Sequence, residues 1–299
     1  MPYGEVITRS FLIAWRHRYL WLIALFSGEA GGSASFNYTP PTGKVPDFGS
    51  VQEQSTNWVS NHAGLLLGLA VAAVLLAVAL FILAAVCEGA TVRASAEHDA
   101  GQPFGLRQAW AAGLHTMWVM VRFRLVLLAI YLPLLAAVVI WVVVLFIGLI
   151  HQDIGLLAGA LFAGLFLFVL VFLYGLYLLF LDRFGSRAVI LEQRTALAAV
   201  ARAHRLLVKR FGRSLLLLVL YLAISFAITI AIGGISTVLL LPVFITGYSS
   251  SAAFLPILAV TAVILIPVSL VVGGFLGAQA STYWTLAFRR LDLDSVATS

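Results

Sequence analysis

Cysteine and charge are both scarce in this chain. Cys87 is the one thiol among 299 residues, and charged residues make up only 10% of the total. A lone cysteine forms no internal disulfide, which excludes a disulfide-stapled secreted scaffold. An average soluble domain is about 25% charged. The low charge therefore excludes a disordered chain and a large water-soluble catalytic domain.

Hydrophobic residues take the place of the missing charge and account for 62% of the chain. They gather in five long apolar runs, at about 64–86, 125–150, 154–181, 215–245 and 252–285. Each run meets the length of roughly 20 residues that a helix needs to cross a bilayer. The sequence therefore predicts an all-α integral membrane protein.

A shorter apolar segment at 19–28 follows three basic residues, Arg16, His17 and Arg18. As a helix of ten residues it would be only roughly 15 Å long. One interpretation is a signal peptide that is cleaved near the small residues at 33–35. The preferred interpretation is a short first transmembrane span whose flanking arginines lie among the lipid headgroups.

The basic residues follow the positive-inside rule. If 19–28 crosses the membrane, 17 of the 18 Lys and Arg residues lie on one side, and Lys44 alone lies in the loop on the other side. This distribution predicts six transmembrane helices with both termini in the cytoplasm and an outer loop at 28–62.

Three amphipathic stretches, with apolar residues spaced i, i+3, i+4 and i+7, end in a basic–aromatic pair: Arg18-Tyr19, Arg122-Phe123 and Arg210-Phe211. Each pair is followed by an outward and a returning span. The single polytopic domain, 1–299, is therefore predicted to hold three pseudo-repeated hairpins, each preceded by an inner-surface amphipathic helix. The repeat units are about 1–88, 89–182 and 183–299.

The amphipathic stretches place basic side chains where they can meet anionic lipid phosphates at the inner face. The candidates for this headgroup contact are Arg18, Arg122, Arg124, Arg202, Arg205, Lys209, Arg210 and Arg213. Two other interpretations stay open: the charges enforce topology while the helices pack on the bundle, or they dock a cytoplasmic partner. Nucleic acid is not an expected partner, because the positive-inside rule already accounts for the net charge of +6.

Two acidic residues, Glu88 and Asp182, end returning spans, and each is followed five residues later by an arginine, Arg93 or Arg187. Acids inside a membrane are costly and often functional. Because these lie near the interface with arginines close by, structural ion pairs are the predicted role. A proton or cation role is the alternative.

The residues that carry chemistry do not form a recognisable constellation. All six histidines lie at span ends or in connections, and no His/Cys spacing is typical of zinc. Glu97-His98-Asp99 is interpreted as a solvated turn, and Ser236 has no histidine deep in another span to activate it. We therefore predict no enzyme activity, no metal, no cofactor and no catalytic residue.

The segments ITRSFLIAWRHRYLWLIALFSG and LEQRTALAAVARAHRLLVKRFGRSLLLLVLYL resemble uncharacterised bacterial multi-pass membrane proteins. These are similar to the membrane domain that is fused to some glycerophosphodiester phosphodiesterases. The resemblance implies a helical membrane fold in the bacterial plasma (inner) membrane. It carries over no activity, because the acids and histidines of the soluble phosphodiesterase barrel have no counterpart in this sequence.

The leading functional hypothesis is a non-enzymatic membrane scaffold or accessory subunit, associated with lipid and with other membrane subunits. Small residues four apart, which let helices approach closely, are interpreted as packing or docking positions: Gly64/Gly68, Gly155/Gly159 and Gly273/Gly277. The alternative is a transporter for an apolar or weakly polar solute, with a path lined by mid-span hydroxyls: Ser225, Thr229, Ser269 and Ser281. An intramembrane enzyme would need Glu88, Asp182 and a histidine around one pocket.

Overall fold

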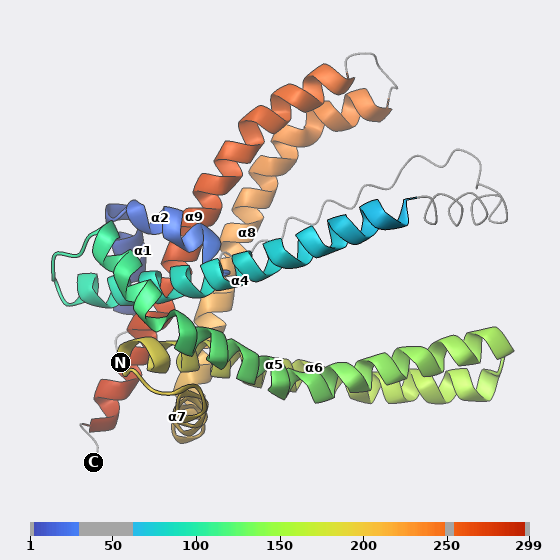
Figure 1. Ribbon diagram of the computed structural model, residues 1–299, viewed down its shortest axis with the longest axis horizontal. Helices are drawn as coiled ribbons and strands as arrows, with labels where there is room; N and C mark the ends of the chain where they lie inside the picture. Colours follow the sequence, from blue (N-terminus) through green and yellow to red (C-terminus); the bar gives the residue numbers. More distant parts are fainter. Residues whose placement is uncertain (1–2, 30–61, 249–253, 297–299) are drawn as a thin grey trace.

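The computed structural model describes residues 3–29, 62–248 and 254–296, and every regular element in these ranges is a helix (Figure 1). In chain order the helices are α1 (Tyr3–Arg16), α2 (Tyr19–Phe26), α4 (Ala63–Asp99), α5 (Leu106–His151), α6 (Ile154–Leu191), α7 (Ala196–Lys209), α8 (Phe211–Tyr248) and α9 (Phe254–Val296). Five of them, α4, α5, α6, α8 and α9, are long and apolar enough to cross a membrane. The chain is therefore an all-helical, multi-pass membrane protein.

The short segment at 19–28 does not form a helix of membrane length. Its helix, α2, has 8 residues and ends where Gly28 adopts a φ of +76°, a left-handed conformation that commonly ends helices. Eight residues span about 12 Å, well short of the roughly 30 Å hydrocarbon core. Residues 30–61, which make up most of the predicted outer loop, lie outside the described part of the chain.

Two of the three expected amphipathic helices are separate elements. α1 buries an apolar face that includes Val6 and Ile13, and α7 buries one that includes Ala203 and Leu206. The third stretch is continuous with the span that follows it, as the first part of α5. The difference arises at the junctions: Arg210 leaves helical geometry with φ −132° and ψ 36°, whereas the helix runs on through Arg122.

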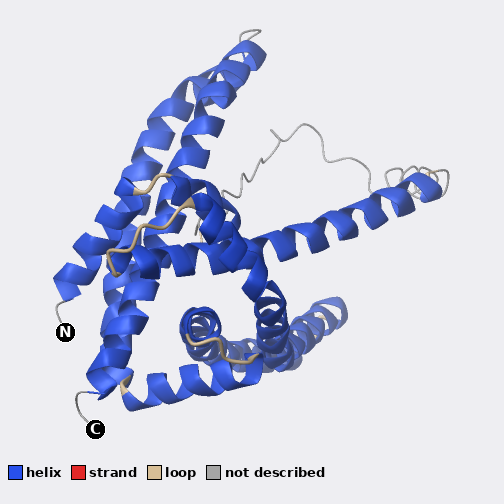
Figure 2. Cartoon of the chain, turned by 60° about the vertical axis from the view of Figure 1, so that its left-hand side comes forward, coloured by secondary structure: helices blue, strands red, loops and turns tan. Residues whose placement is uncertain are grey.

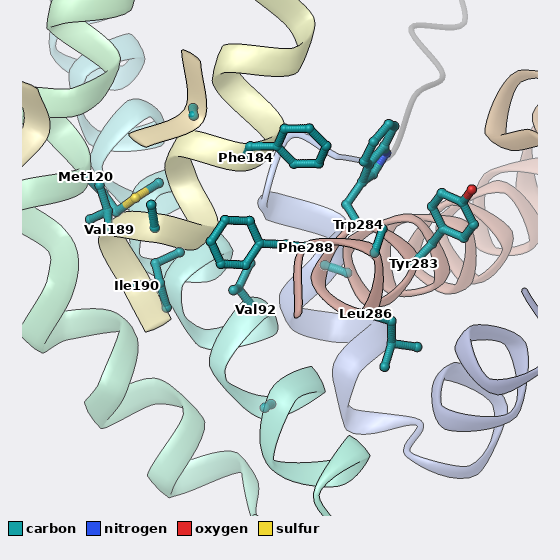
Figure 3. Close-up of a cluster of buried hydrophobic side chains, with 14 of the residues drawn as sticks. Val92, Met120, Phe184, Val189, Ile190, Tyr283, Trp284, Leu286 and Phe288 are labelled. Atoms are coloured by element: carbon teal, nitrogen blue, oxygen red, sulfur yellow. The ribbon is translucent and has the colours of Figure 1, made fainter. Parts of the chain in front are cut away.

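The buried core lies at one end of the molecule, around the last turns of α9. Between residues 278 and 288 this helix is buried on every side, as expected of a helix without a charged face. Its neighbours are α1, α2, α4, α6 and α8. The rings of Phe184, Trp284 and Phe288 pack there, with the Phe184 centroid 5.9 Å from that of Trp284 and 6.4 Å from that of Phe288 (Figure 3). We call this end the base.

Three arms leave the base and diverge: α4, the hairpin of α5 with α6, and the hairpin of α8 with α9 (Figures 1 and 2). The chain buries very little of them. In the most apolar 18-residue window of each long helix, no more than 11% of the residues are buried inside the molecule. The apolar surfaces of the arms are therefore left largely uncovered by the described part of the chain.

The arms join the base through close helix crossings at isolated glycines. A Cβ added to Gly113 of α5 would lie 2.3 Å from the Val86 carbonyl oxygen of α4, and one on Gly185 would lie 2.5 Å from the ring of Phe123. The glycines spaced four apart, which the sequence predicts as packing or docking positions, differ from these. A Cβ on Gly64, Gly68 or Gly159 would meet nothing within 4 Å, so these glycines pack against no other described helix.

Replacing Gly113 with alanine should lower stability, because the new methyl group must push α4 away from α5. Overpacking of this kind costs about 1–3 kcal/mol. Gly68→Ala is the matched control, since it adds the same methyl to the same class of helix in open space and should gain up to about 1 kcal/mol of helix propensity. Thermal unfolding midpoints in one detergent compare the two. Equal midpoints for both variants would show that the α4–α5 crossing is looser than described.

Candidate functional site

A network of ionisable side chains lies where the arms meet the base. Glu29, just after α2, bonds through Oε1 to Nη2 of Arg187 on α6 at 2.6 Å. Glu88 on α4 bonds through Oε2 to Nη2 of Arg124 on α5, also at 2.6 Å. Arg187 Nη1 lies 3.8 Å from Glu88 Oε1 and so links the two pairs. We call the whole group the base cluster: Glu29, Glu88, Arg124, Asp182, Arg183 and Arg187.

Three members of the base cluster are buried, and Arg124, Asp182 and Arg183 are partly exposed. The Arg187 side chain is fully inaccessible, and those of Glu29 and Glu88 are 3% and 4% exposed. Arg187 also donates to the Ser186 hydroxyl and to the Ser281 carbonyl of α9, and Arg183 Nη1 lies 2.9 Å from Glu29 Oε1. A buried charge that loses its partner is strongly destabilising. The cluster therefore ties the end of α2, three arm helices and α9 to one another.

The pairing differs from the one expected within each returning helix. Arg93 pairs with Glu97 at 2.8 Å, while Glu88 and Arg187 reach other helices. The reason is geometric: residues five apart on an α-helix point about 140° apart, whereas residues four apart share a face. Asp182 makes no ion pair or hydrogen bond with any other described residue.

The eight arginines and lysines expected at lipid headgroups separate into three groups. Arg124 belongs to the base cluster, and Arg202 pairs with Glu192 and Asp292, so neither is freely presented to the surface. Arg210 is half-buried. The remainder are exposed around the base: Arg18, Arg122, Arg205, Lys209 and Arg213.

Glu29 is the member of the cluster that sequence reasoning missed, because it was assigned to the outer loop. Burial by itself raises the pKa of its carboxyl, but Arg187 and Arg183 outweigh burial and hold the pKa below its usual value of 4.5. The sequence feature that could have indicated a buried ion pair is Arg187, because it is followed by the apolar run Ala-Val-Ile-Leu. A buried arginine requires an acid from another segment.

A cavity of about 630 Å³ opens beside the cluster, between the end of α2, α4, α5 and α6. Glu29, Glu88, Arg124, Asp182 and Arg183 line one end of it, and the rest of its wall is mostly apolar: Phe81, Leu125, Leu127, Leu128, Tyr131, Gly175, Leu178 and Leu179 among others. The structure thus brings Glu88 and Asp182 to one cavity. No histidine is among the described residues that line it.

A second polar contact joins α1, α2 and the end of α4. The rings of His17 and His98 stack with centroids 3.6 Å apart, and His98 Nε2 lies 2.7 Å from the Tyr19 hydroxyl. Burial, with the nearby Arg16 charge, lowers the pKa of His17. His98 therefore packs against α1 and α2 and is not a solvated turn residue. Within the described ranges, no three His, Cys, Asp or Glu side chains are placed to share a metal ion.

The variant Glu29→Gln should be strongly destabilised, because it leaves Arg187 and Arg183 short of a buried counter-charge. The expected cost is about 3–5 kcal/mol. Glu97→Gln removes an equivalent acid from the more exposed Arg93–Glu97 pair and should cost less than about 1 kcal/mol. Thermal unfolding of both purified variants in detergent measures the contrast. Similar losses of stability in the two variants would show that the base cluster stabilises the fold no more than a surface ion pair does.

Acid should remove the contribution of Glu29. Its folded pKa lies below 4.5, so its stabilisation is complete above that pH and is lost as the pH falls through the folded value. The gap in unfolding midpoint between the wild type and Glu29→Gln should be constant above pH 4.5 and narrow below it. A gap that widens on acidification would mean that the carboxyl is neutral in the folded protein.

Comparison with known proteins identifies a family. No curated protein and no solved structure matches this chain. A family model, described as a family of unknown function (DUF7544), matches residues 7–288, which include all or most of every described helix. The chain therefore belongs to the DUF7544 family of unknown function.

Proposed function

We propose that this protein is a non-enzymatic membrane scaffold or accessory subunit, whose arms are covered by lipid and by other membrane subunits. The observation that carries the proposal is the separation of the arms. The base is a packed core, yet the apolar windows of the five long helices are between 0% and 11% buried within the chain. Helices that assemble a closed path through the membrane would bury much more of each other.

We further propose six membrane crossings in three hairpins, with the base on the cytoplasmic side of a bacterial inner membrane. Glu29 contacts the base, whereas Ala63 begins α4 about 25 residues, roughly 37 Å, before Glu88. Glu29 and Ala63 would then lie at opposite membrane faces, which adds one crossing to those of the five long helices. Every Lys and Arg residue except Lys44 lies in a segment at the level of the base, in agreement with the positive-inside rule.

The exposed basic residues of the base support contact with anionic lipid at the inner face. Arg205 and Lys209 are exposed on α7, whose opposite face is buried, and Arg122 is exposed on α5. Basic side chains beside an apolar helix face are typical of binding to anionic lipid headgroups. The same charges would also hold the base on the cytoplasmic side.

The cavity beside the base cluster favours the transporter as the second candidate. Its wall combines charged and apolar groups, as a site for an amphipathic solute would. The mid-span hydroxyls do not contribute to it: Ser225, Thr229, Ser269 and Ser281 are absent from its lining. Thr229 and Ser269 donate to backbone carbonyls of their own helices, so they do not extend the cavity through the membrane.

Site-specific photocrosslinking in native membranes tests the accessory role. Phe166 on the α5–α6 arm is 72% exposed and Leu197 on α7 of the base is 71% exposed. A photoreactive residue at position 166 should give one reproducible adduct with another membrane protein, and the same probe at 197 should not. Native mass spectrometry after mild extraction should show the same subunit. Lipid adducts alone at 166, with a lone protomer or homo-oligomer in the mass spectrum, would contradict the accessory role.

Cysteine labelling tests the six crossings. In a Cys87→Ala background, single cysteines at Lys44 and Gln152 should react with a membrane-impermeant maleimide added to the outer face of intact cells. Cysteines at Thr8 on α1 and at Lys209 should react only after the membrane is opened. Labelling of positions 8 and 44 from the same side would contradict the sixth crossing.

A further inference from the structure

The cavity beside the base cluster has one charged end and one apolar end. On each of the three helices around it, the charged lining residue lies nearer the base than the apolar one. On α4 the wall runs from Glu88 to Phe81, on α5 from Arg124 to Tyr131, and on α6 from Asp182 to Gly175. Each step is seven residues, or roughly 10 Å along the helix. The cavity axis therefore runs along the arms, from the base into the apolar zone. A volume of about 630 Å³ is within the range of small-molecule sites.

The charged end offers acceptors that the described part of the chain does not use. Asp182 lines the cavity, and its carboxylate has no ion-pair or hydrogen-bond partner among the described residues. Glu29 lines the same end with its side chain 3% exposed, and no described residue donates a hydrogen bond to its buried Oε2. Buried acceptors are normally satisfied. A ligand that fits this end therefore carries N–H or O–H donors, and a positive charge suits Asp182 best.

The same end also offers cationic groups. Arg124 and Arg183 both line the cavity beside Asp182. Each uses one guanidinium nitrogen for an acid of the cluster, Arg124 Nη2 for Glu88 and Arg183 Nη1 for Glu29, which leaves further donors on each. The cluster contains three arginines and three acids. A zwitterionic headgroup would leave this balance unchanged, whereas a singly charged one would bring an uncompensated charge into a buried site.

We propose that this cavity binds a phospholipid with a primary ammonium headgroup, of the phosphatidylethanolamine type. The ammonium donates to Asp182, the phosphate accepts from Arg124 and Arg183, and one acyl chain follows the apolar wall toward Tyr131 and Gly175. The polar end faces the base, so the lipid belongs to the leaflet on the base side. The site does not depend on whether the arms bind another subunit.

Binding to the full chain in detergent, followed by native mass spectrometry, tests the headgroup. The probes are dioleoyl phosphatidylethanolamine and dioleoyl phosphatidylcholine, which share acyl chains and phosphate but differ in the N–H donors. The ethanolamine lipid should bind about tenfold more tightly, the scale of one charge-assisted hydrogen bond. Asp182→Asn should bring the ratio of the two lipid affinities close to one, and Asp182→Glu should keep most of the preference for the ethanolamine lipid. Equal affinities in the wild type, or a ratio unchanged in Asp182→Asn, would overturn the proposal.

Two variants on α6 test the chain-binding end. A Cβ at Gly175 or at Gly159 would meet nothing within 4 Å, so both glycines accept a larger side chain. Gly175 lines the cavity and Gly159 does not. Gly175→Phe should reduce the binding of both lipids several-fold while Gly159→Phe leaves it unchanged, with equal unfolding midpoints for the two variants. Equal lipid binding by the two variants would place the acyl chain elsewhere and overturn the assignment of this cavity.

A headgroup without chains separates a lipid site from a site for a small amine. Glycerophosphoethanolamine has the ammonium and the phosphate of the lipid but no acyl chains. It should not displace the bound lipid at a tenfold molar excess, because the apolar wall contributes much of the binding. Displacement at that excess would show that the site recognises a soluble amine, and the lipid assignment would fail.

Discussion

The ion pair between Glu29 and Arg187 joins two segments that are 158 positions apart in the chain, in surroundings from which water is largely excluded. Charges in such surroundings persist only when they neutralise one another. Glu88 and Arg124 complete the balance, so α4, α5, α6 and the end of α2 are held at one level of the molecule. Five of the six cluster residues also line the charged end of the cavity.

The chain has two structurally different parts, a base with a packed core and arms whose apolar surface is exposed. The last turns of α9 pass through the centre of the base, surrounded by five other helices, with aromatic rings such as Trp284 filling the space. The preceding half of the same helix has no buried residue in its most apolar stretch. A protein built this way packs its core at one end and leaves its apolar arms uncovered by its described residues, which is the basis of the proposed accessory role.

Local patterns in the sequence were sufficient to predict the long helices, since five apolar runs gave five helices of membrane length. They were insufficient where the outcome depends on contacts between helices. Glu29 looked like a loop residue because its partner, Arg187, lies far along the chain. The glycines that allow close crossings, such as Gly113, are isolated, while the regularly spaced Gly64 and Gly68 pack against no residue that the structure describes. The expected six spans, threefold repeat and phosphodiesterase-related resemblance stay predictions.

The separation of the arms is the central claim, and distances between their far ends test it most directly. Spin labels placed pairwise at Gly64, Gln152 and Phe254, in a Cys87→Ala background, mark the three arms for pulsed electron paramagnetic resonance in lipid nanodiscs. Divergent arms predict that all three distances exceed about two helix spacings, roughly 20 Å. Three distances below that value would show that the arms close into a bundle within the membrane, and would contradict the account of a folded base with separate, partner-accessible arms.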